Sequence, residues 1–263
     1  MTTADDAGGS RAQLRQPRLS EIVASELRDR ILSGSLGEEG RLPKQDELIA
    51  EFGVSPPSVR EAMRILETEG LITVLRGNVG GAVARLPTPR RVAYHTGLVL
   101  HVRHTPLGDV GDTIARLEPL CARLCAQRAD REHAVLPALD VAIDAQRAAI
   151  DEPDRFHERA RSFHEAVVDS CGNETLALIL GSLETLWSAH SADWLQRAEG
   201  AGGEKPTADG IRAALTAHEK LRDAIAAGDA DRAAAIAGRH VAATQAFTLR
   251  VERDRMIDAD LAR

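Results

Sequence analysis

A short turn between two amphipathic segments constrains the fold more than any other part of this chain. Segments 45–51 and 58–70 carry apolar residues at helical spacing, and Gly-Val-Ser-Pro-Pro at 53–57 lies between them. Gly53 accommodates the positive φ that often follows a helix. Ser55 can accept a hydrogen bond from a free amide of the next helix, and prolines are tolerated in a first helical turn. These features predict a helix-turn-helix.

A two-stranded wing is expected directly after the second helix. Apolar residues at 71–75 and at 82–83 flank a glycine-rich tip at 76–81. Such a loop could also cradle a nucleotide phosphate, but that use requires a helix after it, whereas a strand signal follows here. A first helix is expected from about Leu19, with an inner apolar stripe formed by Ile22, Val23, Leu27, Ile31 and Leu32. The layout therefore predicts a winged helix-turn-helix. This device places one helix in the major groove and a β-ribbon beside it.

The second helix of the motif separates apolar from basic residues. Val59 and Leu66 are expected to face the core, whereas Arg60 and Arg64 lie four residues apart on another side. Arginine suits the O6 and N7 of guanine, and one bidentate contact discriminates by roughly 1–3 kcal/mol. The alternative is a solvated face on which both arginines pair with neighbouring glutamates. The predicted DNA contacts are Arg41, Lys44, Ser55, Ser58, Arg60, Arg64, Arg76 and Gly77.

The length of 263 residues allows two domains, each with a sizeable core. We expect a tail at 1–16, the DNA-binding domain at 17–86, a linker at 87–90, a helical domain at 91–256 and a C-terminal tail at 257–263. The sequence has no apolar run of membrane-spanning length and no signal peptide, so no membrane partner is expected and the cytoplasm is the expected location.

The net charge of −7 is unusual for a DNA-binding protein. Residues 1–90 contain 12 Lys/Arg and 13 Asp/Glu, so most of the excess acid lies beyond residue 90. Affinity must then come from placed arginines and from two half-sites bound together, not from a general positive field.

The second domain is predicted to be entirely helical, so the fold class is mainly α. Its segments have helical period and are rich in alanine, and only 3% of the chain is aromatic. An all-α bundle of six to seven helices can enclose a pocket. Cys121 and Cys125 lie on one apolar face, where they are expected to be core residues. Helices are expected at about 89–103, 107–129, 131–150, 154–171, 173–198, 208–227 and 229–256.

The N-terminal segments resemble the GntR family of bacterial regulators over about residues 19 to 85. The resemblance is carried by Leu27–Gly34, Arg41–Pro43, Val54–Ser55, Val59–Ala62 and Leu66–Leu71. It implies a base or phosphate contact by Arg60, a phosphate contact by Ser58 and a wing contact by Gly77. Asp46 and Pro56 depart from the family pattern, which implies that the operator differs from the usual family sequence.

Later segments resemble the FCD effector domain of the FadR-like branch of that family, over about residues 90 to 250. They are Arg116–Pro119, Ser162–Ala166 with Cys171–Asn173, and His218–Asp229 with His240. Many members hold a divalent metal through one aspartate and three histidines. The resemblance therefore implies a zinc or nickel site at His164, His218 and His240, although Ala160 stands at the aspartate position.

The same resemblance implies an effector pocket formed by Arg116, His164, His218 and His240. An arginine that often captures an effector carboxylate is replaced by Ile114. The effector is thus expected to be a carboxylate or, because of these departures, an acyl chain or acyl thioester.

The leading hypothesis is a ligand-responsive transcriptional regulator. It would be a homodimeric repressor that binds a palindromic operator and is switched by a small molecule in the helical domain. One alternative is a metal-dependent hydrolase that uses the three histidines, although Glu165 points about 100° away from His164 and makes a poor general base. Another is a sensor bundle with a degenerate DNA-binding head, suggested by Asp46 and Pro56.

Overall fold

The chain folds into two compact units, Met1–Pro87 and Thr88–Arg263. A computed structural model describes residues 18–36, 40–75, 81–86, 88–200 and 207–262. Each unit has its own apolar core.

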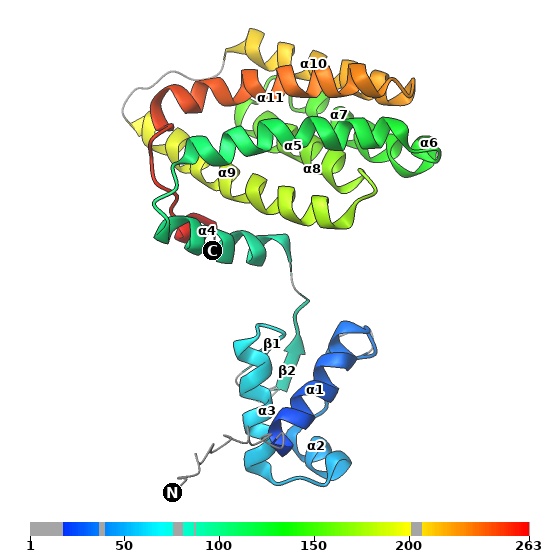
Figure 1. Cartoon of the computed structure of the whole chain (residues 1–263), viewed down its shortest axis with the longest axis vertical. Coiled ribbons are helices and arrows are strands. Elements are labelled where there is room, and N and C mark those ends of the chain that lie inside the picture. The colour runs from blue at the N-terminus through cyan, green and yellow to red at the C-terminus, as the bar shows by residue number, and fades with distance from the viewer. Residues whose placement is uncertain (1–17, 37–39, 76–80, 87, 201–206, 263) are drawn as a thin grey trace, which may run out of the picture. The chain divides into compact units, whose positions relative to one another are not determined.

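The N-terminal unit is a three-helix head with a two-stranded wing (Figure 1). Helix α1 spans Leu19–Leu32, α2 spans Gln45–Phe52 and α3 spans Pro56–Thr68. Strands β1 (Ile72–Leu75) and β2 (Gly81–Ala84) are antiparallel, with Ile72 opposite Ala84 and Leu75 opposite Gly81. The winged helix-turn-helix predicted from the sequence is therefore confirmed.

The turn between α2 and α3 differs in one detail from the expectation. Gly53 has a φ of +61°, as predicted. Ser55 is the N-cap residue in extended conformation, but its hydroxyl caps no backbone amide. The first two helical residues are prolines without N–H groups, so the Ser55 hydroxyl pairs instead with the hydroxyl of Ser58 at 3.0 Å.

One side of α1 was expected to be buried more broadly than it is. Val23, Leu27 and Ile31 are buried as predicted, but Ile22 and Leu32 are 50% and 54% exposed. Both flank the buried residues of α1, which belong to the core that α1 shares with α3.

The C-terminal unit is a helical bundle whose helices α5 and α11 lie side by side (Figure 1). The described residues contain eight α-helices there, one more than expected. They are α4 (Pro89–Val102), α5 (Leu107–Gln127), α6 (Arg131–Ala134), α7 (Leu136–Ala148), α8 (Pro153–Asp169), α9 (Glu174–Gly200), α10 (Ala208–Ala226) and α11 (Ala230–Glu252).

Two predictions for this unit are wrong. The helix expected at 131–150 is interrupted at Val135, where φ is −118° and ψ is −57°, and it becomes α6 and α7. The tail expected at 257–263 instead packs into the bundle: Ile257 and Ala259 are buried, and a 3₁₀ helix at Ala259–Ala262 contacts α4 and α9. In addition, the backbone N–H of Asp258 donates to Nε2 of the buried His190, at 2.8 Å.

No helix within the described part of the chain is long and apolar enough to cross a membrane. The three cysteines are free and buried, as was expected for Cys121 and Cys125.

Candidate functional site

Helix α3 has one buried face and one exposed basic face. Val59, Ala62 and Leu66 are fully buried against the head, while Arg60 and Arg64 are exposed. Arg64 lies 3.7 Å from Glu61, but its side chain remains 79% exposed. Because a surface pair of this length contributes little, it does not hold the guanidinium away from a ligand.

Other acidic residues of the head are engaged with other helices. Arg28 of α1 makes a bidentate contact with Glu69, at 2.9 and 2.6 Å, just beyond α3. Arg30 reaches Glu51 of α2 at 2.6 Å and lies over the ring of Phe52, 5.3 Å from its centroid. These contacts connect α1 to α2 and to the end of α3, and so help to orient α3. They involve the arginines of α1 and leave Arg60 and Arg64 of α3 out.

The remaining predicted DNA contacts fall at several places on the head. Ser58 lies half-buried on the first turn of α3, and Ser55 is exposed beside it. Arg41 is exposed, and its backbone forms an isolated β-bridge with Val83 of the wing. Lys44 is exposed just before α2, and its backbone N–H donates to the carboxylate of Glu47 at 2.7 Å. Arg76 and Gly77 lie outside the described residues.

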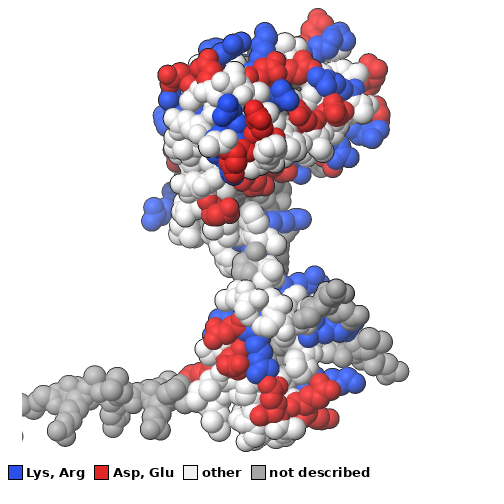
Figure 2. All heavy atoms as spheres, turned by 90° about the vertical axis from the view of Figure 1, so that its right-hand side faces the viewer, with Lys and Arg blue, Asp and Glu red and all other residues white. Residues whose placement is uncertain are grey.

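The face in Figure 2 shows no broad basic field among the described residues. In each unit, lysine and arginine are mixed with aspartate and glutamate over this face. Together with the near balance of charge in residues 1–90, this indicates that DNA affinity depends on individually placed side chains.

Three histidines meet inside the C-terminal bundle. His164 comes from α8, His218 from α10 and His240 from α11, and one ring nitrogen of each lies within 4.8 Å of the others. The Nε2 atoms of His218 and His240 are 2.8 Å apart, and the ring of His164 stacks on that of His240. The structure thus brings together the three residues predicted as metal ligands.

Two side chains behind the histidines orient the rings. A carboxyl oxygen of Glu118 lies 2.5 Å from Nδ1 of His164, and the amide oxygen of Gln146 lies 2.6 Å from Nδ1 of His218. The Gln146 amide nitrogen donates to the carbonyl of Ala142, which turns the amide oxygen toward the histidine. Nδ1 of His218 is therefore the donor, and its Nε2 presents a lone pair to the centre. Such outer partners are typical of metal-binding histidines.

Two of the three rings have lowered pKa values, which suits metal binding. Burial lowers the pKa of His218 well below its ordinary value, and the charges of His164 and His240 act in the same direction. Burial and the charge of His164 lower the pKa of His240 to about 3. Burial also acts to lower the pKa of His164, but Glu118 outweighs this effect and the net pKa is raised. His218 and His240 are thus neutral near pH 7, as a metal requires.

Glu118 and Gln146 were not assigned a role by the sequence reasoning. Glu118 lies in the segment that carries the family resemblance, but its burial was not foreseen. On α7, Gln146 continues the buried stripe formed by Leu139, Ala142 and Ile143. A polar residue at the helical spacing of an apolar stripe indicates a buried polar group, and this pattern could have identified Gln146.

Arg116 and Ala160 do not join the histidine centre. Arg116 is exposed and donates to the carbonyl of Asp112 at 2.7 Å, because it lies two residues from Glu118 and hence on another side of α5. The methyl group of Ala160 packs with a small apolar cluster that includes Phe156. His157 is exposed, and its Nδ1 lies 2.7 Å from the carbonyl oxygen of Pro153.

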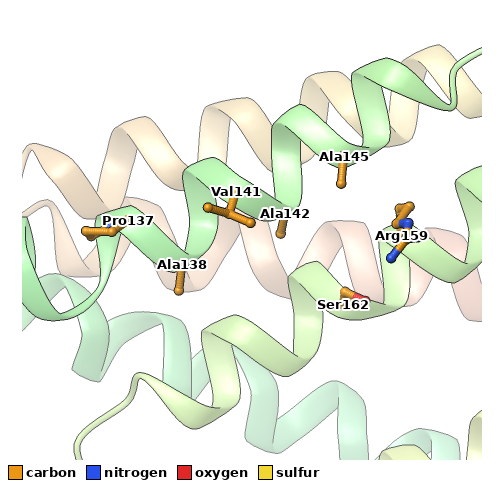
Figure 3. Close-up of a pocket in the computed structure, with 7 residues that line it drawn as sticks. All are labelled: Pro137, Ala138, Val141, Ala142, Ala145, Arg159 and Ser162. Atoms are coloured by element: carbon orange, nitrogen blue, oxygen red, sulfur yellow. The ribbon is translucent and has the colours of Figure 1, made fainter.

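Two surface hollows lie close to this region. One, of about 490 Å³, is bordered by α7 and α8 (Figure 3), and its lining residues are Pro137, Ala138, Val141, Ala142, Ala145, Arg159 and Ser162. The other, of about 340 Å³, is lined in part by Arg161, Glu165, Thr185 and Ser188. Neither is lined by a histidine of the centre, so the effector pocket expected at the histidines does not coincide with either hollow.

Comparison with known proteins agrees with both halves of the chain. Residues 19–80 match the bacterial regulatory proteins of the gntR family, and residues 109–243 match the FCD domain. The chain is 31% identical over 175 residues to the HTH-type transcriptional repressor NanR of Klebsiella aerogenes, covering 65% of this chain and 66% of that protein. It is 28% identical over 225 residues to NanR of Salmonella newport, covering 85% and 82%.

A solved structure shares the fold. The Streptococcus agalactiae GntR structure superposes with a TM-score of 0.62, covering 86% of this chain and 99% of that one, at 20% identity. These matches do not favour the hydrolase alternative, since the family and the relatives are regulators. The chain belongs to the GntR family of bacterial regulatory proteins, as a ligand-responsive, DNA-binding transcriptional regulator with a C-terminal FCD domain.

Proposed function

We propose that the protein is a repressor that binds a palindromic operator as a homodimer, with α3 of each head in the major groove. The observation that carries this proposal is the division of α3 into a fully buried apolar face and an exposed face bearing Arg60 and Arg64. A helix held rigidly by its buried side can place guanidinium groups against base edges at little cost in entropy.

Two heads are needed because one helix reads only a few base pairs. A two-fold symmetric dimer matches a palindrome and adds the binding free energies of two half-sites. The near balance of charge in residues 1–90 also makes non-specific binding weak, so that the operator is preferred mainly through its bases.

In the C-terminal unit, we propose that His164, His218 and His240 hold a zinc or nickel ion. Support comes from the nitrogen atoms that converge within 4.8 Å and from the partners that Glu118 and Gln146 provide. An ion held by these three histidines would supply Lewis acidity toward an oxygen atom of a ligand. The effector in this proposal carries a carboxylate or an acyl group that reaches the ion.

The effector acts on DNA binding by changing the population of dimers whose two heads fit the operator. A ligand shifts such an equilibrium only as far as its affinities for the two states differ. The helices that supply the histidines, α8, α10 and α11, would transmit this preference through their packing against α5 and α7.

Fluorescence anisotropy with the promoter region of the protein's own gene tests the DNA-binding proposal. Arg60→Ala should weaken operator affinity by roughly 1–3 kcal/mol per half-site and leave non-specific affinity much less changed. Arg155→Ala, which removes the same charge from an exposed position on α8, should have no effect.

Two results would count against the proposal. Equal affinity of the Arg60→Ala and unsubstituted proteins would support a degenerate head. Binding that ignores the DNA sequence would remove the operator-specific function altogether.

A further inference from the structure

A second carboxyl group lies inside the C-terminal bundle. Glu184, on α9, is only 8% exposed, and neither of its carboxyl oxygens has a hydrogen-bond partner among the residues that the structure describes. A buried carboxyl left in this state destabilises the folded chain. Such a group calls for a partner, which can be an ion, a ligand or a water molecule.

The part of α9 that carries Glu184 lies beside the part of α8 that carries His164. Thr185, next to Glu184, and Glu165, next to His164, line the same 340 Å³ hollow, and the two helices are in contact. From α5, Glu118 contacts His164 directly. Burial, followed by the negative charge of Glu118, raises the pKa of Glu184 well above its usual range, which is consistent with the two carboxyls being close.

The histidine centre by itself supplies no negative charge. His218 and His240 are neutral, so a divalent ion would bring two positive charges into the bundle interior. Ions buried away from water must be balanced by nearby opposite charges. Glu118 is one such charge, and Glu184 is a second carboxyl with no other partner among the described residues.

We propose that Glu184 provides the second negative charge for a divalent ion held by His164, His218 and His240. The proposal rests on the metal centre proposed above, whose residues come from α5, α7, α8, α10 and α11, and adds to it a residue on a sixth helix, α9. With the ion present, Glu118 and Glu184 face a common cation and no longer only repel each other. The Glu184 carboxylate, which destabilises the metal-free chain, then strengthens metal binding.

The test measures the binding of Zn²⁺ to the full chain by competition with a chromophoric chelator. Glu184→Gln keeps the size of the side chain and removes its charge, so the variant should fold and, in EDTA, should be at least as stable as the unsubstituted protein. Its Kd for Zn²⁺ should rise by about tenfold or more, as for other outer partners of metal sites. The matched control is Glu165→Gln, which removes an exposed carboxyl beside His164 and should change the Kd by less than about twofold.

The outcomes separate this inference from the one on which it rests. If Glu184→Gln binds Zn²⁺ as tightly as the unsubstituted chain, or if both variants weaken binding equally, the role of Glu184 is overturned while the metal centre stands. If the unsubstituted chain binds no Zn²⁺, the metal centre fails and the role of Glu184 fails with it. Operator binding is a separate measurement, and none of these results alters it.

Discussion

Gln146 provides a sharp test of how the histidine centre is held. Gln146 and His218 are both completely buried, and the hydrogen bond between them is 2.6 Å long. Replacing Gln146 by leucine introduces an apolar side chain of similar size and removes the acceptor that Nδ1–H of His218 uses within the described part of the chain. An unpaired buried donor costs about 1–3 kcal/mol, so the free energy of unfolding should fall by that amount.

The substitution should also weaken metal binding. Without Gln146, His218 can move its proton to Nε2 and donate to Nε2 of His240, 2.8 Å away. That tautomer uses the nitrogen that faces the centre, so it competes with a metal ion. A loss of about 10–100-fold in Zn²⁺ affinity is expected for Gln146→Leu, whereas Gln146→Glu keeps an acceptor oxygen and should retain most of the affinity.

Urea unfolding in EDTA, followed by tryptophan fluorescence, measures the free energy of unfolding of each variant without metal. Trp187 and Trp194 are the two tryptophans of the chain, and both lie on α9, so the signal reports on the C-terminal unit. Competition with a chromophoric chelator measures the Kd for Zn²⁺. The reasoning is refuted if the free energy of unfolding of Gln146→Leu lies within about 0.5 kcal/mol of that of the unsubstituted protein and both bind Zn²⁺ equally well. Gln146 would then not set the tautomer of His218.

Two further predictions use the same fluorescence assay. Gly97→Ala should destabilise the C-terminal unit by about 1–3 kcal/mol, because the added Cβ would lie 2.9 Å from Leu186 and 3.2 Å from the backbone of Ala259. Gly181→Ala, also helical but with nothing within 4 Å, should be neutral or stabilising, and equal losses in the two variants would contradict this contrast. Burial raises the pKa of Cys125 from 9.0 to about 12, so the folded chain keeps a proton that the unfolded chain loses, and stability should fall as pH rises through this range. Cys125→Ala should flatten that fall, and an unchanged pH dependence would show that another group causes it.

The DNA-binding head was predictable because its signals are local. A glycine at positive φ, a serine before two prolines and apolar residues at helical spacing act within a few residues of one another, and α2, α3 and the wing form where these signals lie. The wrong predictions for the head concern residues whose local pattern fits both a buried and an exposed position. Ile22 and Leu32 continue an apolar stripe, but periodicity cannot say how far the neighbouring helix extends over it.

The histidine centre was predictable only in part. The three histidines were found by their resemblance to a family pattern, whereas Glu118, Gln146 and Glu184 are ordinary polar residues in the sequence. Their burial depends on which helices cover them, and those helices lie tens of residues away along the chain.

The order of residues by itself determined the division into a winged head and a helical bundle, since breakers, caps and periodicity act through neighbouring backbone groups. Only the tertiary structure decided which polar side chains enter the bundle, that Arg116 stays outside it, and that residues 257–262 pack against α4 and α9. The physical reason is that burial and charge depend on distances in space, which are set when helices far apart in the chain come into contact.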